Sequence, residues 1–344
     1  MSQKDIERSR AARPSRRAVL GAGSAAGLSL MAPGALFAQP ADASRLRIGF
    51  ISPRTGPLAG FGEADGHVLD LARKALAGGL TIGSRHSAVE VIARDTQSGP
   101  PRASQPAKAL IGNEEVALVL VTSAPETVNP VSDACEAAGV PCLSTVMPWE
   151  AWYFGRGAKP GEPSPFKWSF HFSFGVKEFL NCYLSQWSLV PNNRKVAALL
   201  PNDADGNAIR GSLAPALRAA GYTIVDAGPY ETGTTDFSAQ IAKFKAEKCE
   251  LFVTFPIPPD FATFWRQAAQ QGFTKQVKVA QVAKTGLFPS TVEALGPLGF
   301  NLSSGCYWHK TFPYKSLLTG VTGEQLVDGY EAAARKQWNQ QLGA

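Results

Sequence analysis

Residues 116–145, VALVLVTSAPETVNPVSDACEAAGVPCLST, decide the fold class of this chain. The first seven form a near-continuous apolar run, which predicts a buried strand over 116–122. A helical pattern follows over 127–138, and VPCLST at 140–145 predicts the next strand. A strand, a helix and a second strand in this order favour a right-handed βαβ unit. The stretch therefore predicts a parallel sheet flanked by helices.

The same alternation continues outward on both sides. Before this stretch, the sequence predicts strands over 46–52 and 89–95 and helices over 64–76 and 103–111. It restarts after a Gly-, Pro- and charge-rich segment at 155–165. The later predictions are an extended segment at 168–174, strands over 195–201, 222–228, 250–256 and 277–283, and helices over 177–190, 208–220, 237–247 and 261–271. We therefore expect an α/β protein of two Rossmann-like lobes, with a ligand cleft at the carboxyl ends of the strands.

The N-terminal stretch SRRAVLGAGSAAGL (15–28) has two interpretations. Its three glycines resemble a phosphate-binding loop, but polar, arginine-rich residues precede them where that loop needs a buried strand. A basic segment followed by an uncharged run over 18–41 instead favours an export signal over 1–43, with a membrane anchor as the rival. The paired Arg16 and Arg17 resemble a twin-arginine signal, which predicts a periplasmic location.

The positive charge of the chain is concentrated in this segment. The net charge is +6 over 344 residues, and residues 1–38 hold +4 of it, so the remainder carries only +2. This balance gives no electrostatic argument for a nucleic-acid partner. The 44% hydrophobic content is ample for two cores.

The five cysteines match no zinc or redox spacing. In an exported protein, Cys135 and Cys142 are candidates for a disulfide that joins a helix to the following strand. The odd count leaves at least one free thiol.

The loops after the predicted strands contain the candidate site residues. In the loop after the first strand, Phe61 and nearby glycines fit either an ordinary connection or an apolar face against a ligand. After the third, residues 123–126 predict a capping box, with Ser123 as N-cap and Glu126 reaching back. Such a helix start serves capping alone, or it binds a carboxylate through its unpaired N–H groups.

Three further loops contain aromatic or charged side chains. Trp149 and Trp152 follow the fourth strand beside hydroxyls, which favours a pocket lining over core packing. Residues 202–207, NDADGN, resemble the start of a calcium loop, but the required acid would fall on Ala214, so we expect a polar strand–helix turn. Lys284, just after an apolar strand, is either a lone cation in the cleft or a solvated lysine.

No catalytic motif emerges from the sequence. It lacks G-x-S-x-G, H-E-x-x-H and the phosphate loop G-x-x-x-x-G-K-[ST], and its four histidines are scattered. We therefore predict a protein that is not an enzyme and needs no cofactor or metal.

Four stretches, taken with the export signal and the two lobes, resemble one known family: RIGFISPRTGPLAGFG (47–62), SAPETVNPVSDACEAAGVPCLST (123–145), DFSAQIAKFK (236–245) and FWRQAAQQGF (264–273). The family is that of the periplasmic branched-chain amino acid (Leu/Ile/Val)-binding proteins, the type 1 periplasmic binding fold that serves ABC importers. The resemblance runs from about Arg45 to the end. It implies a first lobe over 44–172 plus 307–344 and a second over 173–306, joined by hinge crossovers.

The resemblance also implies a ligand site. In that family, hydroxyls and backbone N–H groups of the first lobe hold the ligand carboxylate, while an aromatic and an acid of the second lobe hold the rest. The first-lobe positions are Ser123, Ala124, Thr127, Thr145, Val146 and Pro148, with Phe61 and Trp149 nearby. The second-lobe aromatic falls at Asp205, and the acid falls at or beside Lys284.

Two departures from the family pattern alter these expectations. A cation at Lys284 stabilises a carboxylate rather than an ammonium, so we predict a small organic acid, aromatic acids included, or an amino-acid-like ligand. The chain also ends with AARKQWNQQLGA (333–344), whereas members of the family continue past a similar segment. We therefore expect a first lobe that is incomplete at its C-terminus, with apolar surface uncovered.

The predicted function is a periplasmic solute-binding protein that closes its lobes on a small molecule and delivers it to the permease and ATPase subunits of an ABC importer. A ligand-sensing subunit of a signalling system and, as a third interpretation, an exported enzyme are the alternatives.

Overall fold

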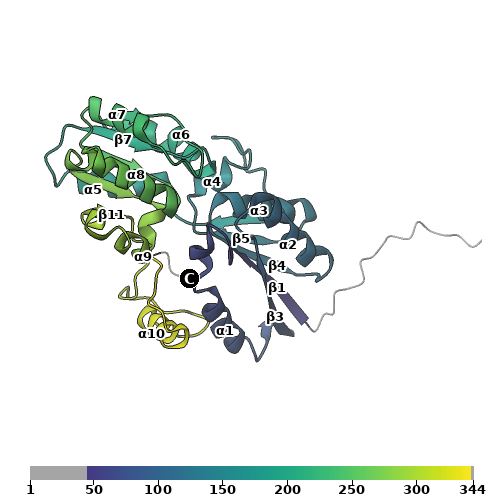
Figure 1. The fold of residues 1–344 in the computed structure, drawn as a ribbon. Coiled ribbons are helices and arrows are strands. Elements are labelled where there is room, and N and C mark those ends of the chain that lie inside the picture. Colours follow the sequence, from purple (N-terminus) through teal and green to yellow (C-terminus); the bar gives the residue numbers. More distant parts are fainter. Residues whose placement is uncertain (1–44, 342–344) are drawn as a thin grey trace, which may run out of the picture. The chain divides into compact units, whose positions relative to one another are not determined.

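The computed structural model describes residues 45–341, so the predicted export signal with Arg16 and Arg17 lies outside the described residues. The described chain forms two sheets, which belong to one unit (Figure 1). The first sheet has the strand order β2-β3-β1-β4-β5-β6, and the second has the order β11-β10-β9-β7-β8. Neighbouring strands run parallel, except that β2 pairs with β3 antiparallel. This is the predicted α/β fold class.

The elements follow the predicted alternation. The strands are β1 (Arg45–Ser52), β2 (Leu80–Ile82), β3 (Arg85–Asp95), β4 (Leu118–Thr122), β5 (Cys142–Thr145), β6 (Ser169–Phe172), β7 (Lys195–Leu199), β8 (Thr223–Asp226), β9 (Leu251–Thr254), β10 (Val279–Val282) and β11 (Leu302–Ser303). The helices are α1 (Asp65–Ala75), α2 (Pro100–Gly112), α3 (Pro125–Ala138), α4 (Trp149–Tyr153), α5 (Val176–Trp187), α6 (Ala204–Ala219), α7 (Ser238–Ala246), α8 (Pro258–Gln270), α9 (Pro289–Glu293) and α10 (Gly323–Ala334).

Prolines explain why several helices begin earlier than the apolar pattern predicts. Pro100, Pro125 and Pro258 each start a helix, two or three residues before the predicted first residue. A proline fits there because the first N–H groups of a helix have no intrahelical acceptor and the ring fixes a helical φ. The sequence analysis did not predict the edge strand β2 or helix α10.

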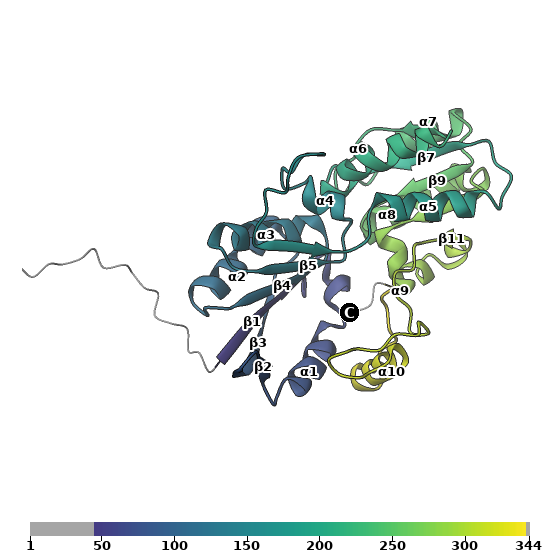
Figure 2. The same cartoon turned by 180° about the vertical axis from the view of Figure 1, so that it is seen from behind.

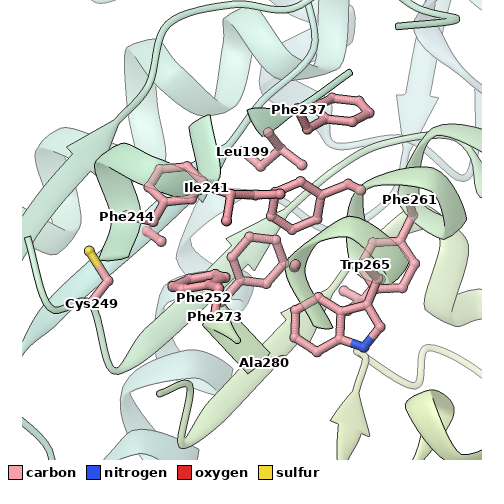
Figure 3. Packing of buried hydrophobic residues seen from close by; sticks show 14 of the residues in the cluster. Leu199, Phe237, Ile241, Phe244, Cys249, Phe252, Phe261, Trp265, Phe273 and Ala280 are labelled. Carbon is pink, nitrogen blue, oxygen red and sulfur yellow. The ribbon is translucent and has the colours of Figure 1, made fainter. Parts of the chain in front are cut away.

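The second sheet is packed on both faces (Figures 1 and 2). Helices α7 and α8 cover one face with an aromatic-rich cluster, in which Phe252 stacks on Phe264 with ring centroids 5.2 Å apart. Figure 3 shows other rings of this cluster, with Phe252 beside Phe273 and Phe261 beside Trp265. Helices α5 and α6 cover the other face. Such packing makes this sheet a rigid support for the loops at its strand ends.

The first sheet has one well-packed face, against α2 and α3. On the edge strand β6, Phe170 and Phe172 are exposed, and Leu143, which pairs with Phe170 from β5, is exposed too. Alternate residues of one strand and their direct cross-strand neighbours share a face, so these side chains form one apolar surface.

The candidate disulfide between Cys135 and Cys142 is not formed. Both residues are free thiols within the described chain, and both are buried in the core between α3 and the first sheet. The neighbouring Cys142 and, after it, burial raise the pKa of Cys135. The two cysteines act as small apolar side chains in a packed core.

Candidate ligand-binding site

A narrow cavity of about 30 Å³ lies at the carboxyl ends of strands from both sheets. This volume is well below the roughly 300–1,000 Å³ usual for small-molecule sites, so the walls enclose little free space between them. The lining residues are Phe61, Ser123, Ala124, Val146, Met147, Pro148, Phe174, Phe179, Asp205, Phe255, Ala283, Lys284, Leu287 and Tyr307. Most of them follow the ends of β1, β4, β5, β6, β7, β9 and β10, where parallel sheets hold their ligands.

The structure brings most of the predicted site residues to this cavity. Those that line it are Phe61, Ser123, Ala124, Val146, Pro148, Asp205 and Lys284. Thr127, Thr145 and Trp149 do not line it. Thr127 is buried in α3, where its hydroxyl donates to the carbonyl of Ala124 at 3.2 Å, and Trp149 is partly exposed.

Ser123 is not the N-cap that the sequence predicts. Ala124 is the N-cap of α3 and makes no side-chain capping bond, because Pro125 occupies the first helical turn and sets where the helix begins. Ser123 instead adopts a left-handed φ of 118°, and its hydroxyl is buried, lines the cavity and has no hydrogen-bond partner among the described residues. The hydroxyl therefore lies beside the positive end of the helix dipole, free to bind a ligand.

Glu126, the other residue of the predicted capping box, does not cap the helix either. Both carboxylate oxygens of Glu126 are buried and make no hydrogen bond within residues 45–341. The negative charge of Glu126 raises the pKa of both Lys284 and Asp205, so it adds to the negative charge around this pair.

The loop after β5 forms the other part of the first-sheet wall. Val146 has a φ of 86°, a conformation that is strained for a β-branched residue. His171 supports this loop, because its Nε2 lies 2.8 Å from the carbonyl oxygen of Met147 and its Nδ1 lies 2.8 Å from the Ser144 hydroxyl. Backbone strain of this kind persists where surrounding contacts enforce it, typically at binding sites.

Trp152 packs in the core rather than in the pocket, so the pocket-lining interpretation is wrong for this residue. It is buried, its indole N–H donates to the Ser132 hydroxyl at 3.2 Å, and its ring stacks on His171. It thereby helps to fix the histidine that supports the 146–148 loop.

Lys284 is neither of the two things that its sequence position allowed, a lone cation in the cleft or a solvated lysine. It is buried, and its Nζ lies 2.7 Å from Asp205 Oδ2 and 3.4 Å from Asp203 Oδ2. Burial lowers the pKa of Lys284, but the nearby carboxylates of Asp205, Glu126 and Asp203 outweigh it and hold the pKa well above its usual value. The ammonium is therefore permanently charged and already paired, so its charge is not free for a ligand carboxylate.

Asp203 and Asp205 have different roles in the 202–207 turn. Asp203 is the N-cap of α6, where its Oδ1 accepts the N–H of Gly206 at 2.7 Å. Asp205 is 4% exposed, and its Oδ1 is buried with no hydrogen-bond partner in the described chain. Burial raises the pKa of Asp205 to about 7, although Lys284 pulls in the opposite direction. The turn is thus a charged part of the cavity wall.

The family model for the periplasmic binding proteins matches residues 45–344. This chain belongs to that family. The match covers everything after the predicted export signal, including each loop that lines the cavity. No curated protein sequence is significantly similar to the chain.

Solved structures of the same family share the fold at low sequence identity. Leucine-binding LivK from Thermotoga maritima superposes with a TM-score of 0.69 at 18% identity, over 86% of this chain and 78% of that one. LivJ from Streptococcus pneumoniae, in complex with isoleucine, superposes with a TM-score of 0.65 at 19% identity, over 87% of this chain and 80% of that one. A solute-binding protein from R. palustris, in complex with 4-hydroxybenzoate, superposes with a TM-score of 0.64 at 18% identity, over 84% of this chain and 78% of that one. At this identity the similarity establishes the type 1 periplasmic binding fold alone.

The aromatic part of this binding-protein cavity is what the sequence analysis missed. Phe174 and Tyr307 stack with ring centroids 4.0 Å apart and planes 9° from parallel. Phe179 meets Phe255 edge to face at 5.3 Å. Phe174 and Phe255 each follow a strand, and this position could have identified them. Tyr307 lies after β11, far along the chain, and no local signal marks it.

None of the helices within residues 45–341 has the length and apolar character needed to cross a membrane. The same residues contain no group of three or more His, Cys, Asp or Glu side chains arranged to hold a metal ion.

Proposed function

We propose that this protein is the periplasmic solute receptor of an ABC importer. It captures a small organic acid or amino-acid-like solute in the cavity and delivers it to a membrane permease with its ATPase subunits. Membership of the periplasmic binding protein family supports this role. The amino acid named for LivJ and the 4-hydroxybenzoate named for the R. palustris protein indicate the range of solutes that this fold accommodates.

The unpartnered hydroxyl of Ser123 at the start of α3 carries the proposal. A buried hydroxyl without a hydrogen bond is unfavourable unless a ligand satisfies it. Beside it, the first N–H groups of α3 lack helical acceptors and the helix dipole is positive, which suits a ligand carboxylate. The rings of Phe61, Phe174 and Phe255 supply apolar walls for the body of the solute.

Binding and closure constitute the proposed mechanism. The solute contacts residues that follow strands of both sheets, so its binding energy favours the arrangement in which these loops enclose it. The permease then recognises the loaded, closed form. No covalent step is involved.

Thermal unfolding with benzoate, 4-hydroxybenzoate, leucine and isoleucine tests the proposal. A solute at one hundred times its Kd stabilises the protein by about 2.7 kcal/mol, which raises Tm by several degrees. Ser123→Ala should weaken the affinity for that solute by roughly 10- to 100-fold, the usual effect of losing a hydrogen bond to a charged group.

The matched control is Ser185→Ala, on the exposed face of α5, which should bind like the wild type. The proposal is wrong if no solute in the panel raises Tm. Equal losses of affinity in both serine variants would remove Ser123 from the site.

A further inference from the structure

Asp205 has one carboxylate oxygen that nothing in the described chain satisfies. Its Oδ2 contacts Lys284 at 2.7 Å, while its Oδ1 is buried, without a hydrogen bond, in a residue that lines the cavity. An ionised oxygen in such a place is unfavourable because burial removes its solvation. A protonated carboxyl in the same place has a hydroxyl to donate.

The charges around Asp205 favour its neutral form. Lys284 faces it from the turn after β10, Asp203 from the start of α6, and Glu126 from the start of α3. Asp205 and Asp203 thus share the ammonium of Lys284, Glu126 adds a further negative charge nearby, and repulsion among like charges opposes the ionisation of at least one of the three. Burial, Glu126 and Asp203 together raise the pKa of Asp205 to about 7 against the attraction of Lys284.

The other two carboxylates do not have this combination of properties. Both oxygens of Asp203 are engaged, one by the Gly206 N–H and the other by Lys284. Glu126 does not line the cavity. Within residues 45–341, Asp205 alone among the three combines a position in the wall with a free oxygen.

The location of Asp205 creates a conflict for an acidic solute. Helix α6, which contains Asp205, contacts α3, whose N-terminal end lies beside Ser123. A solute carboxylate at Ser123 therefore lies in the same small cavity as Asp205. Two carboxylates confined together cannot both remain charged without a strong penalty, as in sites where two acids share one proton.

We propose that Asp205 determines the specificity of the cavity for carboxylate solutes by binding them in its neutral form. Its Oδ1 hydroxyl donates a hydrogen bond to an oxygen of the solute, while Oδ2 stays with Lys284. Each bound anion then takes up one proton from the buffer, which is transferred to Oδ1, and no other bond changes. This inference rests on the proposed function.

Titration calorimetry with benzoate, in phosphate and in Tris at equal pH, measures the proton directly. The two buffers differ in ionisation enthalpy, so proton uptake appears as a difference in the observed heat. Because Asp205 titrates near pH 7 in the free protein, we expect uptake of about one proton per benzoate at pH 8 and almost none at pH 6. The affinity should fall about tenfold per pH unit above 7.

Asp205→Asn is the decisive variant, because its amide retains a donor but cannot titrate. It should bind benzoate with no proton uptake and with an affinity that is constant between pH 6 and pH 8. Asp260→Asn is the matched control, since Asp260 is also buried on the second-sheet side and its pKa is also raised by burial, but it does not line the cavity. It should retain the full proton uptake.

The outcomes separate this inference from the proposed function. Benzoate binding without proton uptake at pH 8, or with proton release, overturns the inference and leaves the receptor function intact. Binding of leucine but not of benzoate at pH 6 does the same. Proton uptake that persists in Asp205→Asn assigns the proton elsewhere and overturns it. Failure of every solute in the panel to bind overturns both.

Discussion

The two walls of the cavity use different means to present polar groups to a solute. The first-sheet wall, built by the loops that contain Ser123 and Val146, is neutral and offers a hydroxyl beside a helix start. The second-sheet wall holds Lys284 and Asp205 in a buried ionic cluster. Both walls contain a non-glycine residue with left-handed φ: 118° at Ser123, 86° at Val146 and 51° at Lys284.

The difference shows where each kind of recognition originates. Local backbone geometry shapes the neutral wall, because the turn into α3 gives Ser123, which lines the cavity, its left-handed φ. Side chains from separate elements create the charged wall, which exists only once the second sheet has formed. Changes on the charged wall should therefore affect the whole fold more than changes on the neutral wall.

The largest effect is expected from Lys284→Met. This change leaves the buried carboxylate of Asp205 and the partly buried carboxylate of Asp203 without their cation. Breaking a buried ion pair on one side typically destabilises by about 3–5 kcal/mol. Urea unfolding at pH 7 measures the change. Lys278→Met is the control, because its pair with Glu250 is partly exposed, and it should alter the stability by no more than about 1 kcal/mol. Equal stabilities of the two variants would contradict the ionic description of this wall.

Smaller effects on stability, with opposite pH dependence, are expected for Glu136→Gln in α3 beside the first sheet and for Asp205→Asn in α6 beside the second. Burial opposes the ionisation of Glu136, but hydrogen bonds from Lys167, Ser169 and Trp168 outweigh it and lower its pKa. Its contribution to stability, about 1.5–3 kcal/mol for bonds to a charged group, is present at pH 7. It is lost as pH falls through this lowered pKa, below 4.5.

Asp205 behaves in the opposite sense. Its folded pKa of about 7 lies above the ordinary value of 3.8, so the folded state binds more protons between these values, and wild-type stability falls as pH rises through that window. Asp205→Asn removes this fall. Urea titrations at pH 4, 5.5 and 7.5 compare each variant with the wild type. If the stability of each variant changed with pH just as that of the wild type does, neither Glu136 nor Asp205 would be the source of the pH dependence assigned to it.

The smallest effect is expected from Val146→Gly on the neutral wall. Glycine relieves the strained φ of 86°, which offsets its greater loss of chain entropy and the loss of a half-buried side chain, so stability should change by less than about 1 kcal/mol. The same substitution at Val121, buried in β4, should destabilise by about 3 kcal/mol. A comparable loss at both positions would show that Val146 is not strained.

Local patterns were sufficient to predict most of the long elements. The apolar run of β4, the helical period of α3 and the short β5 were all recognised, because a helix or strand repeats its burial pattern over a few residues. The wrong cap at Ser123 has a local cause as well. N-cap preference favoured serine, but Pro125 fixed the start of α3 one residue later.

Local sequence patterns could not predict the pairing of charges in the site. Lys284 follows β10 and Asp205 follows β7, about eighty positions earlier in the chain. They meet because the sheet order β10-β9-β7 places both strand ends on the same edge, with only β9 between them. Local patterns therefore left Lys284 as either a lone cation in the cleft or a solvated lysine, whereas the structure pairs it. Tyr307, which joins the aromatic wall by stacking on Phe174, was missed for the same reason.

The sequence by itself determined that the chain is an α/β protein of alternating strands and helices, and that the loops after the strands contain the candidate site. These properties depend on period and composition, which act within one element. Only the tertiary structure decided which of those loops share a cavity, that Ser123 is free while Lys284 is paired, and that Asp205 has an unsatisfied oxygen. Those properties depend on distances between elements that are remote in the chain, because Coulomb and hydrogen-bond energies are set by spatial separation and burial rather than by sequence spacing.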